Sequence, residues 1–79
     1  MKAKIYVTLK PGVLDPQGKA VAHSLHDLGF DDVADVRQGK YLEVELTTPD
    51  KKKARADLEE MCKKLLANTV IEDYRIEIE

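Results

Sequence analysis

The sequence predicts an α+β fold: a two-layer sandwich with the element order β-α-β-β-α-β, in which two helices lie on one face of a mainly antiparallel sheet. Apolar and polar residues alternate in four short segments, as in strands with one buried face, and apolar residues recur at helical spacing in two longer segments. One apolar face per element requires two packed layers. The 79 residues suffice for a single domain, 1–79.

The first strand and the first helix have clear limits. Apolar and polar residues alternate over residues 3–10, and Pro11-Gly12 ends that strand because proline lacks a backbone donor and glycine permits a turn. Asp15 is suited to cap a helix that begins at Pro16, and Gly29 to end it in a left-handed conformation. The helix from about Pro16 to Leu28 carries an apolar stripe: Val21, Leu25 and Leu28.

Residues 33–45 contain two strand-like runs around Gly39. The second run has alternating apolar residues that should face inward: Leu42, Val44 and Leu46. A three-residue loop, Arg37-Gln38-Gly39, keeps Val36 on the same face and places glycine last, where a positive φ is favoured. We expect this hairpin, with a bulged turn as the alternative.

The second helix is expected to begin after Thr48, which precedes Pro49 and is suited to be the N-cap. Its apolar stripe recurs at intervals of three and four residues: Ala54, Leu58, Met61 and Leu65, widened by Cys62 and Leu66. A last strand alternates Tyr74, Ile76 and Ile78 with charged residues. Right-handed connections between these elements give a ferredoxin-like arrangement, although the strand order is not fixed by the patterns.

Composition argues against nucleic-acid binding. The 13 basic and 15 acidic residues give a net charge of −2, without the basic excess that a polyanion surface needs. An RNA-recognition sheet needs exposed aromatics on a basic face, whereas Tyr41 is accompanied by Glu43 and Glu45. The alternating start of the chain, and the lack of any segment near roughly 20 apolar residues, favour a cytoplasmic location.

Residues with reactive side chains form no recognisable active site. Cys62 is the only cysteine and lies on an apolar stripe, which indicates a buried structural thiol. His23 and His26 lie one helical turn apart but lack the three or four oriented ligands of a metal site. No phosphate-binding glycine loop is present. We therefore expect no catalytic, cofactor-binding or metal-binding residue.

The segment between the second helix and the last strand is unusually apolar for a connector. Val70 and Ile71 are adjacent, so an extended backbone points them to opposite sides, and at most one joins the core of a single chain. Apolar side chains left outside a small domain often mark a contact with another chain. The alternative is a strand that starts early, at Thr69, with a kink.

Two segments have a distinctive sequence: Leu-Asp-Pro-Gln-Gly at residues 14–18 and Leu-Leu-Ala-Asn-Thr-Val-Ile-Glu-Asp-Tyr at residues 65–74. With other segments over nearly the whole chain, they resemble the PurS family in order and spacing. The Arg-Gln-Gly-Lys segment at residues 37–40 is weaker evidence alone, and residues 47–53 match less closely.

The resemblance implies a non-catalytic subunit of phosphoribosylformylglycinamidine (FGAM) synthase, an ATP-dependent ligase of de novo purine biosynthesis. That enzyme converts formylglycinamide ribonucleotide (FGAR), glutamine and ATP to FGAM, glutamate, ADP and phosphate. The resemblance further implies that a large synthetase subunit, PurL, binds ATP and Mg²⁺, and that a glutaminase, PurQ, releases ammonia. A PurS homodimer or higher assembly would help to hold the two together, and this chain itself would bind no cofactor.

Six residues are the candidate contacts with partner chains. Gln17, Arg37 and Lys40 lie in matched segments and could hydrogen-bond a partner, while Val70, Ile71 and Tyr74 are candidates for an apolar interface. Arg37 could equally be a solvated turn residue. The alternative function is a small homo-oligomeric regulatory or metabolite-binding domain.

Overall fold

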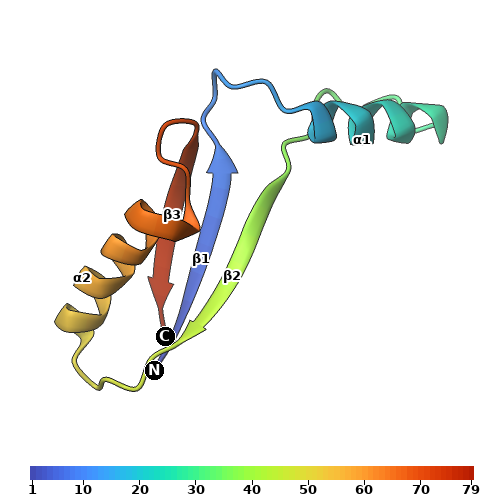
Figure 1. Cartoon of the computed structure of the whole chain (residues 1–79). Helices are drawn as coiled ribbons and strands as arrows, with labels where there is room; N and C mark the ends of the chain where they lie inside the picture. The colour runs from blue at the N-terminus through green and yellow to red at the C-terminus, as the bar shows by residue number, and fades with distance from the viewer.

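The computed structural model describes the whole chain, residues 1–79, as a three-stranded sheet with two helices (Figure 1). The elements are β1 (Lys2–Leu9), α1 (Pro16–Asp27), β2 (Gly39–Glu45), α2 (Lys51–Met61), a π-helical turn η1 (Cys62–Leu66) and β3 (Glu72–Ile78). The sheet order is β2-β1-β3, and both outer strands run antiparallel to β1. The α+β class with an antiparallel, ferredoxin-like sheet is confirmed.

The core lies between the sheet and α2. Ile5 in the central strand is fully buried and pairs with Leu42 on one side and Ile76 on the other. These side chains share one face of the sheet because residues opposite each other in a ladder point the same way. The buried cluster comprises Ala3, Ile5, Val7, Leu58, Cys62 and Ala67. The predicted inward faces of β1, β2 and β3 are therefore correct.

The predicted strand over residues 33–36 is wrong, and with it the hairpin around Gly39. Residues 33–38 are not in a strand, so the observed element order is β-α-β-α-β. They return from the far end of α1 to the sheet, and their polar groups bond within that region: a ring nitrogen of His26 lies 2.6 Å from the Val33 carbonyl oxygen. Because this segment spans the gap between the far end of α1 and the start of β2, it cannot also form a strand paired with the sheet.

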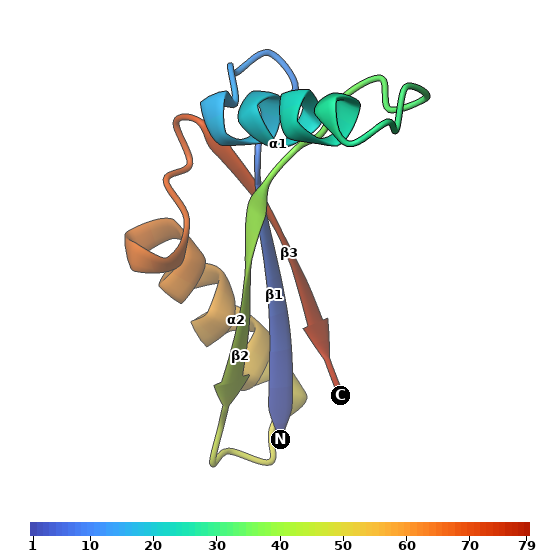
Figure 2. The same ribbon diagram turned by 90° about the vertical axis from the view of Figure 1, so that its right-hand side faces the viewer.

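Helix α1 does not cover the sheet, which corrects the prediction that both helices lie on one face. It projects beyond the end of the sheet, and only α2 packs on a sheet face (Figures 1 and 2). The chain extends 49 × 24 × 14 Å and has a radius of gyration of 16.0 Å. A compact domain of this length has about 12 Å. Neither helix has the length and apolar composition needed to cross a membrane.

The ends of the helices follow the predicted chemistry with two exceptions. Helix α1 is capped by Asp15, and Gly29 adopts a φ of 98°, both as predicted. Helix α2 is capped by Asp50 instead of Thr48, because the Asp50 carboxylate accepts the amides of Lys52 and Lys53. The other exception is Leu65, predicted on the buried stripe but 82% exposed, since the π-helical turn alters the spacing of side chains.

Candidate interaction surface

Helix α1 and the loops at its two ends form an arm, residues 10–38, with an unpartnered apolar side. Leu28 is 72% exposed, and other large apolar side chains of the arm are also open to solvent: Leu14, Val21 and Phe30. Within α1 only Gly18 is buried. Of the amphipathic stripe predicted from the sequence, Val21 and Leu28 are exposed and Leu25 is partly buried, so this chain leaves most of the stripe uncovered.

The connector between α2 and β3 carries the second exposed apolar group. Leu65 and Val70 are more than 80% exposed, and Ile71 is also exposed. The backbone here is ordered by Asn68, whose side-chain oxygen accepts the Val70 amide and whose carbonyl accepts the amides of Ile71 and Glu72. The connector is thus a fixed turn that presents apolar side chains outward, and not an early strand starting at Thr69.

Arm and connector meet near the end of β1. The Lys10 amide donates to the Ile71 carbonyl at 2.9 Å, so the entry to the arm is bonded to the exit of the connector. On the other side, the Lys40 ammonium lies 3.4 Å from the Leu66 carbonyl and 3.8 Å from the Glu72 carboxylate. The two apolar groups therefore belong to the same end of the molecule.

The remaining polar residues predicted to contact a partner form hydrogen bonds within this chain. Arg37 donates to the carbonyls of Lys10 and Val13, and Gln17 accepts a hydrogen bond from the Gln38 side chain. The Tyr74 hydroxyl donates to Glu59 of α2 at 2.6 Å, and this bond, together with burial, raises the pKa of Tyr74 to about 12. Contacts of these residues with partner chains stay predictions.

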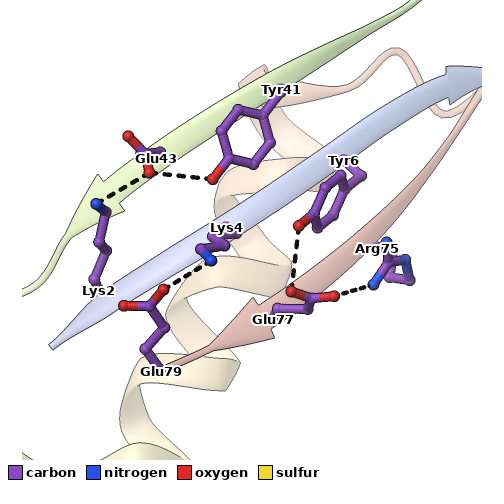
Figure 3. Close-up of polar contacts among 8 residues, drawn as sticks. All are labelled: Lys2, Lys4, Tyr6, Tyr41, Glu43, Arg75, Glu77 and Glu79. Carbon is purple, nitrogen blue, oxygen red and sulfur yellow. Dashed lines mark hydrogen bonds and ion pairs between the residues drawn. The ribbon is translucent and has the colours of Figure 1, made fainter.

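The face of the sheet opposite α2 is open and polar. Its lysines pair with carboxylates of the neighbouring strands, Lys2 with Glu43 at 3.0 Å and Lys4 with Glu79 at 2.8 Å (Figure 3). Tyr6 donates to Glu77, which also pairs with Arg75, and the Arg75 guanidinium lies over the Tyr6 ring at 4.1 Å. Because opposite charges are matched locally, this face lacks the basic excess that an RNA-recognition sheet needs.

The reactive side chains are not arranged for catalysis. Cys62 is fully buried and unpaired in a disulfide, and burial raises the pKa of its thiol, as predicted for a structural cysteine. His23 lies near Asp27 on the exposed side of the arm, while His26 contacts the Val33 carbonyl. Two shallow hollows of about 330 and 440 Å³ are lined mainly by charged and polar residues and include neither Cys62 nor a histidine.

Comparison with known sequences decides the family. A sequence model described as "PurS: Phosphoribosylformylglycinamidine (FGAM) synthase" matches residues 2–79. The chain belongs to the PurS family.

Individual PurS relatives are similar over nearly their whole length. The chain is 55% identical over 82 residues to the Bacillus subtilis phosphoribosylformylglycinamidine synthase subunit PurS, covering 99% of this chain and 92% of that protein. The crystal structure of B. subtilis PurS superposes with a TM-score of 0.90 at 54% identity, covering 99% of this chain and 96% of that one. Since this superposition includes the arm, its projection from the sheet is common to both PurS folds.

A PurS chain in a larger assembly is also similar. The structure of PurLQS from Thermotoga maritima contains a chain that superposes with a TM-score of 0.87 at 30% identity, covering 96% of this chain and 93% of that one. That PurS-like fold is therefore found in a complex named for three components, PurL, PurQ and PurS.

Proposed function

We propose that this chain is a non-catalytic subunit of FGAM synthase that assembles the PurL synthetase and the PurQ glutaminase, so that ammonia released from glutamine reaches the FGAR-bound site. Membership of the PurS family supports this function, as does the likeness to a chain of the T. maritima PurLQS complex. We place ATP and Mg²⁺ on PurL, and the chain itself binds no cofactor. Its location is the cytoplasm, where the free thiol of Cys62 stays reduced.

The observation that carries the proposal is the amount of apolar surface this chain leaves uncovered. Only 9 of 79 residues are buried, while the arm and the connector expose large apolar side chains at one end of the molecule. A domain of this size has a limited core, and oligomerisation is a common way to add to its stability. Self-association to a homo-oligomer and docking on PurL and PurQ are the proposed means of covering it.

Reconstitution of the three subunits tests the proposal. FGAM formation is measured with PurL and PurQ, with and without this chain, using either glutamine or ammonia as the nitrogen source. An assembly role predicts that glutamine-dependent synthesis requires the chain, whereas ammonia-dependent synthesis by PurL does not, because free ammonia bypasses PurQ. Glutamine-dependent synthesis that is equally fast without the chain, and no co-elution with PurL or PurQ, would contradict it.

The alternative, a regulatory metabolite-binding domain, gives a different result. Binding of a metabolite to the folded chain raises its melting temperature. A melting temperature that rises with FGAR, glutamine, ATP or ADP in the isolated chain, combined with no retention of PurL, would favour that function.

A further inference from the structure

The two chain segments that join α1 to the sheet are hydrogen-bonded to each other at the base of the arm. The first runs from the end of β1 to α1 and includes Lys10 and Val13; the second runs from the end of α1 to β2 and includes Val36 and Gln38. No other backbone connects α1 to the sheet (Figure 2). The direction in which α1 projects therefore depends on how firmly these two segments are held together.

Asp15 joins the two segments with one carboxylate. Its Oδ1 accepts the Gly18 amide at 2.8 Å, which caps α1, while its Oδ2 accepts the Gln38 amide at 2.7 Å from the returning segment. Capping requires only the first bond. Asp15 as a whole residue is 4% exposed and is the only buried acidic residue of the chain. The second bond has no role in forming the helix and instead ties the helix to the strand that follows.

Arg37 also joins the two segments, but its side chain comes from the returning segment, whereas that of Asp15 comes from the entering segment. Its guanidinium, on the returning segment, donates to the Val13 carbonyl at 2.9 Å and to the Lys10 carbonyl at 3.0 Å on the entering segment. The Gln38 side chain adds a bond of 2.9 Å to Gln17. A planar guanidinium can satisfy two acceptors at once, which a lysine ammonium does less specifically.

Gly18 shows how closely the segments approach. A Cβ atom at this position would lie 2.1 Å from the Val36 carbonyl oxygen and 2.8 Å from the Asp15 carboxylate. Any side chain at position 18 would therefore collide with the neighbouring segment, so the position requires glycine. The base of the arm is thus packed backbone to backbone and bonded from both sides.

We propose that Asp15, Gly18 and Arg37 form a lock that fixes the direction of α1 relative to the sheet and so positions the apolar side of the arm for assembly. The lock explains why the segments resembling PurS at residues 14–18 and 37–40, which contain no catalytic group, come together in space. Only the effect of the lock on assembly rests on the proposed function. Whether the lock holds the arm rigid can be measured on this chain alone, without PurL or PurQ.

The first test compares Asp15→Asn and Arg37→Lys with Asp31→Asn, which makes the same chemical change at an exposed position on the arm. Backbone ¹⁵N relaxation is measured for each full-length variant, with circular dichroism to check the fold. The lock predicts that heteronuclear NOE values of α1 fall in both lock variants while those of β1 and α2 stay unchanged, and that Asp31→Asn alters neither. Unchanged NOE values in α1 would overturn the lock. Arg37→Lys keeps the test valid if Asp15→Asn unfolds.

The second test measures assembly with the same three variants. Retention on immobilised PurL and PurQ should weaken by about tenfold in the lock variants, and glutamine-dependent synthesis should fall while ammonia-dependent synthesis by PurL does not. Loss of α1 order with normal retention would overturn the positioning role. If the unaltered chain itself fails to bind PurL and PurQ, the proposed function fails, and the relaxation data still decide whether the lock exists.

Discussion

Replacing Val70 with aspartate tests whether the exposed connector is covered by another protein. Val70 is 81% exposed, and its side chain takes no part in the core of this chain. Full burial of a valine-sized side chain contributes roughly 1.5–3 kcal/mol. The exposed share of Val70 therefore corresponds to roughly 1.2–2.4 kcal/mol, which is a loss of affinity of about 7- to 50-fold when the contact is removed. Burial of the new carboxylate would add to this loss.

The assay compares Val70→Asp with Thr47→Asp, which adds the same charge at an exposed position in the loop between β2 and α2, at the other end of the molecule. Oligomer mass is measured by light scattering, and binding to PurL and PurQ by titration. We expect weaker association only for Val70→Asp, with both variants retaining the circular dichroism of the unaltered chain. Equal association of the two variants would refute the idea that the connector is an interface.

Three further predictions concern the chain itself. Leu58→Ala should lower the free energy of unfolding by about 2–5 kcal/mol in urea denaturation, because Leu58 is fully buried between α2 and the sheet; a loss below about 1 kcal/mol would contradict that packing. The hydrogen bonds from the Gln38 and Gly18 amides hold the pKa of Asp15 below its ordinary value of 3.8. Its contribution to stability should therefore be present above about pH 4 and be lost as the pH falls through the lowered, folded-state pKa. Melting curves between pH 5 and 2 check this, and an equal pH dependence in Asp15→Asn would speak against it. Cys62 should resist a thiol reagent at neutral pH until the chain is unfolded, because burial removes access and raises its pKa; rapid labelling of the folded chain would show that the core is open.

Most of the secondary structure could be predicted because local chemistry determines it. The alternation in β1 and the Asp15-Pro16 and Gly29 signals of α1 gave elements close to those observed. The strand predicted at residues 33–36 failed because two valines three residues apart are compatible with many backbones. Leu65 was misplaced because a single π-helical turn alters the spacing that places side chains on one face.

The position of α1 could not be predicted, since an amphipathic stripe shows that a helix is to be buried but not by which chain. The connector was recognised because Val70 and Ile71 are adjacent and cannot both face one core. The base of the arm was missed for a different reason. Asp15 was identified as a cap and Arg37 as a turn or partner contact, and nothing in the sequence indicates that residues so far apart bond the same two segments.

The pairing of β1 with β3 also determines when the chain can fold during synthesis. Ala3 lies opposite Ile78, so the central strand, which is made first, obtains its second neighbour only after every other element has left the ribosome. Until then β1 can form only a two-stranded ribbon with β2, which is marginally stable in water. The complete sheet can therefore form only after β3 has emerged from the ribosome, and a nascent chain stalled before β3 is expected to remain exposed to aggregation or proteolysis.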